Sequence, residues 1–223
     1  MYSIAIDGPA GAGKSTIAKE IAGRMGFIYV DTGAMYRAMA IYFLRKGIRG
    51  DDRETIASLC PEISVSIVYD EEGKQQVLLN GENVTPFLRE EEVGKMASVT
   101  SAIPEVRAAL LDLQRNLAAT SDVLMDGRDI GTHVLPDASL KIYLTASSEV
   151  RARRRYDELC QKGIECDLHQ IEQDIIQRDK QDMEREIAPL RQAEDAILVD
   201  SSDLTKEAVI DVITRLVEKA RRV

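Results

Sequence analysis

The sequence predicts an α/β fold, with a three-layer core around a five-stranded parallel sheet, an inserted small antiparallel β subdomain and a short helical segment. Three observations carry this prediction. Short β-branched runs alternate with stretches of helical apolar spacing, which is typical of parallel strands joined by helices. A glycine-rich loop joins the first strand to the first helix. In residues 63–81 the apolar period changes to two, which indicates antiparallel strands.

The first 44 residues alternate strand and helix twice. The opening β-branched run ends at Asp7 and Gly8, where a turn interrupts it. The apolar residues that follow recur every three or four positions, as expected of one helix face. Asp31 or Thr32 can cap the second helix. The expected bounds are 2–6 and 27–30 for the strands, and 15–25 and 32–44 for the helices.

The stretch after residue 62 predicts a β-hairpin. Apolar and polar residues alternate in 63–69, residues 70–73 form a turn, and 75–79 lead into Asn80-Gly81. That dipeptide is typical of tight hairpin turns. We therefore expect three short antiparallel strands, inserted into a chain whose other strands are parallel.

The second half of the chain returns to alternating strands and helices. Pro104 is suited to the first turn of a helix. A helical pattern that starts at residue 148 is interrupted by Gln161, Lys162 and Gly163, which indicates a break between two helices. The expected strands are 123–125, 140–144 and 196–199, and the other expected helices are 104–119 and 204–220.

The composition excludes several classes of protein. The 223 residues hold 29 Lys and Arg against 38 Asp and Glu, and a net charge of −9 argues against nucleic-acid binding. Residues 51–92 hold 11 acidic and 3 basic residues, so most of this charge lies in the insert and does not argue against anionic nucleotides. No apolar run approaches a membrane span, and no basic leader precedes residue 7. We expect a cytoplasmic protein without a membrane partner.

The cysteines and histidines offer little material for metal or redox chemistry. Cys60, Cys160 and Cys166 are odd in number and lack Cys-x-x-Cys spacing, so we expect all three to be packing residues in a reducing compartment. His133 and His169 are the only histidines. A catalytic histidine or a metal cluster is therefore not expected.

The strongest motif is a phosphate-binding loop. Residues 8–15 match the pattern Gly-x-x-x-x-Gly-Lys-Ser/Thr between a predicted strand and a predicted helix, which is the context that this motif requires. Glycines let successive backbone N–H groups point at phosphate oxygens, and the helix N-terminus adds positive charge. Lys14 can reach the β- and γ-phosphates, and Ser15 or Thr16 can turn a hydroxyl toward Mg²⁺. The loop residues are Gly8, Pro9, Ala10, Gly11, Ala12, Gly13, Lys14, Ser15 and Thr16.

The arginines indicate the kind of reaction in which the phosphate loop takes part. The chain has no Asn-Lys pair, so the Asn-Lys-x-Asp motif expected of a GTPase switch is missing. Arg37 follows the second strand, and Arg128 follows the strand at 123–125. In open α/β sheets, ligands lie beyond the carboxyl ends of the strands, which is where both arginines are expected. Guanidinium groups there can hold a second phosphate and offset the charge of a transferred phosphoryl group.

A further set of charged residues lies between residues 148 and 190. One helix face carries Arg151, Arg154 and Arg155, and another carries Arg178, Asp182 and Arg185. An arginine-rich flap of this kind can close over phosphates and exclude water. Phosphoryl transfer between two bound phosphate compounds is therefore the favoured hypothesis.

Each of these residues has a plainer interpretation. A single arginine could be a solvated side chain paired with a neighbouring acid. Asp182 could form an ion pair or bind a sugar hydroxyl. Asp126 could be an acid on the magnesium side of the loop or part of a common Asp-Gly turn.

The chain resembles the bacterial-type cytidylate (CMP/dCMP) kinases of the nucleoside monophosphate kinase family. The resemblance covers nearly the whole chain. The stretches that contain DGRDIGT and RDKQDMEREIAPL are more particular to this family than the phosphate loop is. The matching stretches are IDGPAGAGKST (6–16), DTGAMYR (31–37), ASVTSAIPEVR (97–107), DGRDIGTHVLPDA (126–138), LTASSEVRARRR (144–155) and QRDKQDMEREIAPL (177–190).

The resemblance implies transfer of phosphate from ATP to CMP or dCMP, with Mg²⁺. We expect the protein to be a monomer. It implies one P-loop kinase domain over 1–223. Its core would be 1–40, 120–150 and 191–223, its monophosphate-binding region with the β insert about 41–119, and its short helical lid about 151–190. Some relatives have glycine where Ser15 stands, which would leave Thr16 as the hydroxyl on the magnesium side.

The resemblance also assigns roles to residues. The catalytic group would be Lys14, Arg128, Arg154 and Arg185. ATP would be bound by residues 8–16 with Arg151, Arg154 and Arg155. The monophosphate side would comprise Thr32, Arg37, Ser98, Arg107, Arg128, Asp129, Arg178, Asp182 and Arg185, with Ser98, Arg107 and Asp129 on the cytosine and Arg178 and Asp182 on the ribose. Asp126 would assist Mg²⁺.

Two alternatives stay open from the residues. One is another small-molecule kinase on the same core, with UMP, AMP or shikimate as the acceptor. The other is a regulatory nucleotide-binding module with slow ATP hydrolysis. No strong general base is expected for the favoured reaction, because the phosphate oxygen of CMP is already anionic.

Overall fold

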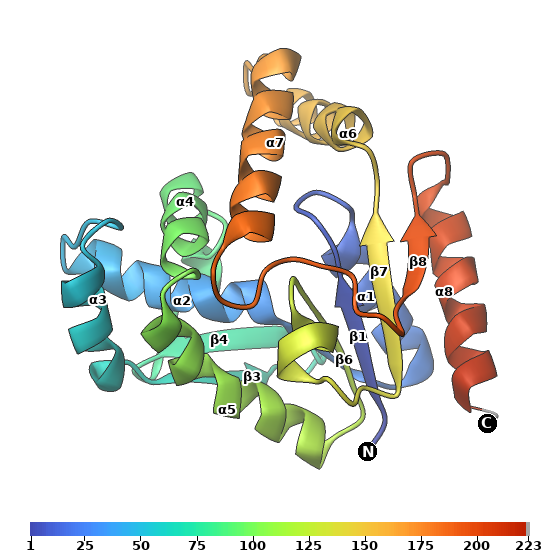
Figure 1. Ribbon diagram of the computed structural model, residues 1–223, viewed down its shortest axis with the longest axis horizontal. Helices are drawn as coiled ribbons and strands as arrows, with labels where there is room; N and C mark the ends of the chain where they lie inside the picture. The colour runs from blue at the N-terminus through green and yellow to red at the C-terminus, as the bar shows by residue number, and fades with distance from the viewer. Residues whose placement is uncertain (222–223) are drawn as a thin grey trace. The chain divides into compact units, whose positions relative to one another are not determined.

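A five-stranded sheet forms the centre of the first part of the fold (Figure 1). The computed structural model describes residues 1–221. The strand order is β2-β6-β1-β7-β8, and β1 pairs in parallel with both β6 and β7. The predicted α/β class with a parallel sheet is confirmed. The strands are β1 (Ser3–Asp7), β2 (Ile28–Asp31), β6 (Val123–Gly127), β7 (Leu140–Thr145) and β8 (Ile197–Asp200).

The chain divides into two compact units, residues 1–29 with 121 onward and residues 30–120. In the first unit, α1 (Lys14–Met25) and α8 (Lys206–Arg221) bury their apolar faces against the sheet. Apolar side chains recur at helical spacing in both helices, so each presents one continuous stripe to the strands. The final helix begins at Lys206, two residues after the expected start.

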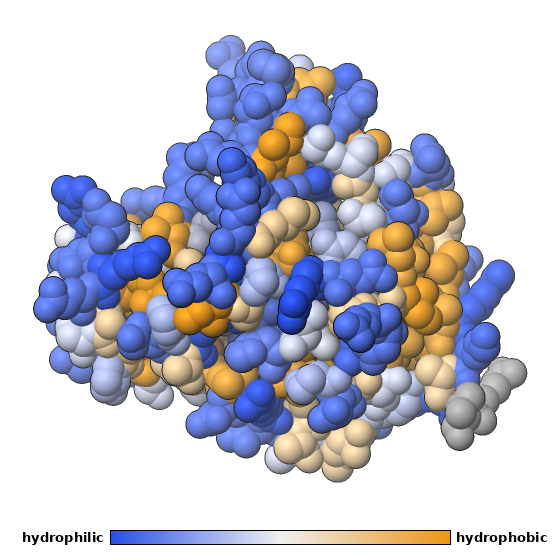
Figure 2. Space-filling model, in the orientation of Figure 1, coloured by the Kyte–Doolittle hydropathy of each residue, from blue (hydrophilic) through white to orange (hydrophobic). Residues whose placement is uncertain are grey.

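Two further helices of the first unit follow β7. They are α6 (Ser148–Gln161) and α7 (Leu168–Glu184), which pack against each other beyond the carboxyl end of β7 (Figure 1). The predicted break between them is confirmed, because Gly163 adopts a left-handed φ of 71° that reverses the chain. Hydrophilic side chains cover most of the visible surface of this hairpin (Figure 2).

The second unit contains the predicted antiparallel insert. Three strands pair in the order β3-β4-β5, with Val65 opposite Leu79 and Tyr69 opposite Gln75. Asp31 caps α2 by accepting a hydrogen bond from the Ala34 amide at 3.0 Å. The elements are β3 (Val65–Tyr69), β4 (Gln75–Leu79), β5 (Glu82–Asn83), α2 (Thr32–Arg45), α3 (Arg53–Leu59), α4 (Glu91–Thr100) and α5 (Pro104–Thr120).

Several short elements of the structure have no clear signal in the sequence. The helices α3 and α4 were not expected, and neither were the 3₁₀ turns Cys60–Glu62 and Thr85–Phe87 or the π-helical turn Ile130–Val134. Three acidic residues precede the first buried residue of α4, Val93, so its apolar stripe is short. A short stripe is a weak signal of a helix.

One expectation about the cysteines is wrong. Cys60 is buried, as a packing residue should be, whereas Cys160 is exposed and Cys166 is half-buried. Cys160 lies in the last turn of α6. The only buried residues of this helix are Arg151 and Ala152, near its start. The helix therefore offers Cys160 no core to pack against.

Candidate active site

The phosphate loop connects β1 to α1. Gly8 lies against β7, and a Cβ atom at this position would stand 1.9 Å from the carbonyl oxygen of Leu144. Gly13 precedes the helix with a left-handed φ of 86°. Both positions require glycine, because a side chain would collide at Gly8 and would be strained at Gly13. The predicted loop is thus built by close backbone packing at one end and a left-handed residue at the other.

Lys14 is folded back onto the loop. Its side chain is buried, and Nζ donates to the carbonyl oxygen of Pro9 at 2.8 Å. Burial, assisted by the nearby charge of Arg128, lowers the pKa of Lys14 to about 7. A bound phosphate would favour the charged form, so the lysine is suited to an anionic ligand.

Asp126 gathers two hydroxyl groups at the end of β6. Ser15 donates from Oγ to one carboxylate oxygen at 2.8 Å, and Tyr29 donates to the other at 3.0 Å. Ser15 and Thr16 are both exposed, so burial does not distinguish the two candidate hydroxyls. The hydrogen bond to Asp126, the acid proposed for the magnesium side, is the feature that favours Ser15.

Asp7 is a site residue that sequence reasoning missed. It was interpreted only as the end of the first strand, yet its buried carboxylate accepts hydrogen bonds from the amides of Ile130 and Gly131 at 2.8 and 2.7 Å. Burial raises the pKa of Asp7 to about 6, against the lowering effect of these bonds. The contact fixes the turn that follows Asp129. An acid at the end of a buried strand, directly before the glycine loop, was the available signal.

Arg128 and Asp182, both singled out in the sequence, are brought together. Arg128 donates from Nε to Asp182 at 2.8 Å, and both side chains are largely buried. Burial alone would raise the pKa of Asp182, but Arg128, together with Arg178 and Arg185, lowers it below its ordinary value. Arg178 lies one helical turn before Asp182 on α7.

Arg185 and Asp129 form a second buried pair. Arg185 donates from Nη2 to Asp129 at 3.1 Å, with 5% and 6% of the two side chains exposed. Arg185 also donates from Nε to the carbonyl oxygen of Ala188 at 2.6 Å. Asp129, expected on the cytosine, is thus paired with Arg185, which is expected in catalysis and on the monophosphate side.

Arg151 joins three segments of the first unit. Its guanidinium donates to the carbonyl oxygens of Ala146 and Ala10, both at 2.9 Å, and to Asp179 of α7 at 2.6 Å. Ala10 belongs to the phosphate loop. Arg151 therefore ties that loop to the α6–α7 hairpin, and Asp179 is a second residue that sequence reasoning missed.

The other two arginines of α6 have different surroundings. Arg154 donates to the carbonyl oxygen and hydroxyl of Ser201 at 2.7 and 3.3 Å, just after β8. Arg155 is half exposed and pairs with Glu158 of the same helix at 2.9 Å. Arg151 and Arg154 thus contact segments outside their own helix. Arg155 instead forms a surface ion pair within α6, which is the plainer of the two interpretations of an arginine given above.

The remaining candidates lie in the second unit. Thr32 and Arg37 belong to α2, and Thr32 is buried at its first turn. Arg107 is buried on α5 and donates to the carbonyl oxygen of Ser101 at 3.3 Å, while the Ser101 hydroxyl donates to the carbonyl oxygen of Ser98 at 3.1 Å. The two residues expected on cytosine in this unit, Ser98 and Arg107, are therefore linked through Ser101.

Over residues 1–221, no helix has the length and apolar character needed to cross a membrane.

Comparisons with known proteins agree over the full length. A family model described as cytidylate kinase matches residues 4–219. A cytidylate kinase of Exiguobacterium sp. (strain ATCC BAA-1283 / AT1b) is 51% identical over 218 residues, which cover 98% of this chain and 97% of that protein. A cytidylate kinase of Caldicellulosiruptor saccharolyticus is 51% identical over 219 residues, with coverage of 97% and 96%.

A solved structure supports the fold alone. It is an uncharacterized protein from Eubacterium ventriosum, which aligns over 98% of this chain and 97% of its own with a TM-score of 0.50 and 12% identity.

Proposed function

This chain belongs to the cytidylate kinase family, and on that basis we propose that it transfers the γ-phosphoryl group of ATP to CMP and dCMP. The products are ADP with CDP or dCDP. One observation in the first unit supports this most: the buried Lys14 lies close enough to the largely buried Arg128 that burial, and then the charge of Arg128, lowers the pKa of Lys14. Cations gathered next to the phosphate loop favour the binding of anionic phosphates there.

The reaction requires positioning and charge stabilisation rather than a strong base. An oxygen of the CMP phosphate attacks the γ-phosphorus of ATP in line with the departing ADP oxygen, and it is already ionised at neutral pH. Lys14 faces the β- and γ-phosphates, while Arg128 holds the acceptor phosphate. These cations offset the charge that spreads over the transferred group.

Other residues are proposed to bind the two nucleotides. Residues 8–16 with Arg151, Arg154 and Arg155 bind ATP, and Arg154 and Arg185 also act in catalysis. The residues proposed to bind CMP are Thr32, Arg37, Ser98, Arg107, Arg128, Asp129, Arg178, Asp182 and Arg185. The segment 151–190 acts as the lid, and 41–119 as the monophosphate-binding region.

Mg²⁺ is proposed to arrive with ATP. The Ser15 hydroxyl and the Asp126 carboxylate are hard oxygen donors that suit this cation. Within residues 1–221, no three His, Cys, Asp or Glu side chains are grouped to hold a metal ion, so phosphate oxygens would supply the other ligands. When bound, the ion neutralises charge on the β- and γ-phosphates.

We also propose that the protein acts in the cytoplasm, as a monomer and without a nucleic-acid partner. The net charge of −9 supports the last point.

The proposed activity is tested by measuring ADP release with CMP, dCMP, UMP, AMP and shikimate in turn. We expect rapid turnover with CMP or dCMP. A preference for AMP or shikimate would refute the acceptor, and ATP turnover that no monophosphate changes would indicate a regulatory ATPase instead.

A further inference from the structure

The turn between α6 and α7 brings two cysteines together. Helix α6 ends at Gln161, and the Gly163 amide then donates to the carbonyl oxygen of Cys160 at 2.9 Å. The Ile164 amide donates to the carbonyl oxygen of Leu159 at 3.0 Å. This pair of backbone bonds closes the helix end and turns the chain back, so that Cys166 returns over the last turn of α6.

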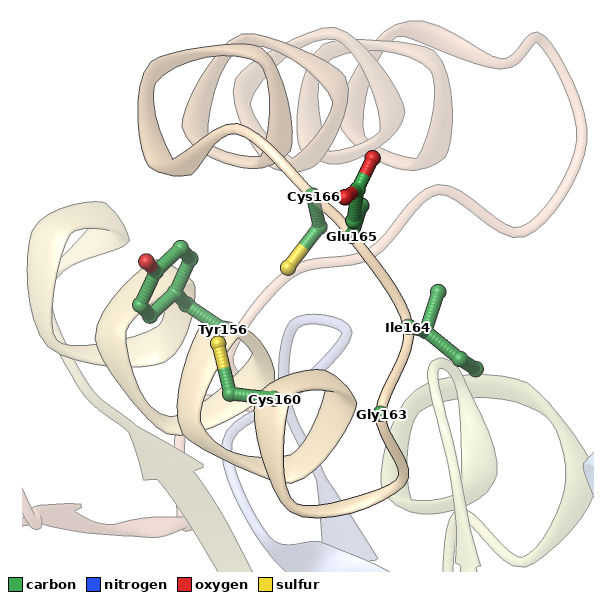
Figure 3. A pocket seen from close by; sticks show the side chains of 6 residues that line it. All are labelled: Tyr156, Cys160, Gly163, Ile164, Glu165 and Cys166. Carbon is green, nitrogen blue, oxygen red and sulfur yellow. The ribbon is translucent and has the colours of Figure 1, made fainter.

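Both thiols project into one hollow. Its volume is about 470 Å³. Cys160 points into it from α6, and Cys166 points toward Cys160 from the segment before α7 (Figure 3). The lining residues are Tyr156, Cys160, Gly163, Ile164, Glu165 and Cys166.

The chemistry of the pair is that of a dithiol. Burial raises the pKa of Cys166, and a hydrogen bond with Cys160 raises it further. Both thiols line the same hollow, with Cys166 pointing toward Cys160 (Figure 3), and the raised pKa means that Cys166 loses its proton less readily than an ordinary thiol does. Because the described residues hold no third metal-binding side chain grouped with them, a metal centre is not favoured here.

We propose that Cys160 and Cys166 are a modification site, at which exchange with a low-molecular-weight disulfide forms a reversible intramolecular disulfide. Cys160 reacts first because it is exposed and Cys166 is half-buried. The site lies on the face of the hairpin turn. It uses neither the phosphate loop nor the buried arginine pairs.

The reaction balances in two exchange steps. The Cys160 thiolate attacks one sulfur of the small disulfide RSSR, which forms a Cys160–SR bond and releases one RS⁻. Cys166 then loses its proton and attacks Sγ of Cys160, which forms the Cys160–Cys166 bond and releases the second RS⁻. The two cysteines lose two electrons in total, RSSR gains them, and the two cysteine protons leave with the two released thiols.

The raised pKa of Cys166 makes the second step dependent on pH. Only the thiolate attacks, so below that pKa the closing rate should rise about tenfold for each pH unit. Closure of the mixed disulfide should therefore be slow at pH 6 and rapid at pH 8.5.

The test uses the full-length protein, oxidised glutathione as the probe, and intact mass as the readout. The unmodified chain should lose about 2 Da through ring closure, and Cys166→Ser should instead keep one bound glutathione, a gain of about 305 Da. Cys160→Ser should remain unmodified for much longer than either. The matched control, Cys60→Ser, should close at the same rate as the unmodified chain, because Cys60 is buried elsewhere.

Two results would overturn the proposal. One is an unmodified chain that keeps glutathione at pH 8.5 without closing, and the other is a linked pair that includes Cys60 or a second molecule, as shown by peptide mapping and a non-reducing gel. Circular dichroism shows whether each serine variant is folded. A folded variant whose mass differs from the predicted mass counts against the assignment.

Discussion

Arg128 donates a hydrogen bond of 2.8 Å to Asp182, 54 positions further along the chain. The guanidinium proposed to hold the acceptor phosphate is therefore already paired with an acid. Since the guanidinium has five N–H donors in a planar fork, it can bind phosphate while the Nε bond to Asp182 persists. The pair places Arg128 in a fixed orientation before the monophosphate arrives.

Replacing Arg128 should impair the use of CMP much more than the use of ATP. We expect Arg128→Ala to lower kcat/KM for CMP by an amount on the order of 2 to 4 kcal/mol, through the lost phosphate contact. Arg49→Ala is the matched control, because Arg49 pairs with Asp51 on the exposed surface. Steady-state kinetics with each substrate varied in turn checks this, and an equal loss for ATP would refute the role.

Asp182 should distinguish ribose from deoxyribose if it reads the sugar. Asp182→Asn keeps the shape of the side chain but removes the charge that pairs with Arg128. We expect kcat/KM to fall by different factors for CMP and dCMP. If kcat/KM falls by the same factor for both substrates, Asp182 does not read the sugar and serves only to orient Arg128.

Asp7 should make stability depend on pH in an unusual direction. Its pKa is raised from 3.8 to about 6 in the folded protein, so its stabilising contribution is complete below about pH 4 and is lost as pH rises through 6. The difference corresponds to about 3 kcal/mol. Denaturant unfolding of the unmodified protein and Asp7→Asn should show a difference in stability that changes between pH 4 and 7. A constant difference would contradict the assignment.

Gly8 should tolerate no side chain. In Gly8→Ala the new Cβ would stand 1.9 Å from the Leu144 carbonyl oxygen, so the loop or β7 must move. We expect a loss of at least about 3 kcal/mol in stability and loss of ATP binding. Gly23→Ala is the control, because no atom lies within 4 Å of its added Cβ and alanine favours the helix by about 1 kcal/mol. Thermal melts with and without ATP compare the two variants.

Ser15 should matter more for Mg²⁺ than Thr16 does. Both residues are exposed, but the Ser15 hydroxyl donates to Asp126 at 2.8 Å. We expect Ser15→Ala to raise the Mg²⁺ concentration needed for half-maximal activity by more than Thr16→Ala does. A magnesium titration of both variants measures this, and a larger effect at Thr16 would reverse the assignment.

The strands and the phosphate loop could be predicted because their signals are local. The β-branched run of β1 and the glycine pattern up to Gly13 are visible in neighbouring residues, and the break at Gly163 follows from a single residue type. The helix α4, which carries Ser98, was missed because its first turn is acidic and its apolar stripe is short. Local reasoning fails where the local pattern is weak.

The partners of the site residues could not be predicted at all. Asp7 accepts from Ile130 and Gly131, more than 120 positions away, and Arg185 reaches Asp129 across 56 positions. No feature near Asp7 or Arg185 in the sequence indicates these contacts. They depend on which strands become neighbours in the sheet and on where α7 ends.

The position of β1 in the sheet affects how the chain can fold during synthesis. β1 is synthesised well before both of its neighbours in the sheet, because β6 and β7 begin more than 110 residues later. The core is completed only by Val209, Ile213 and Val217 of α8. β1 must therefore stay unpaired until β6 and β7 have been synthesised, and the core of the first unit can close only after α8 has been added.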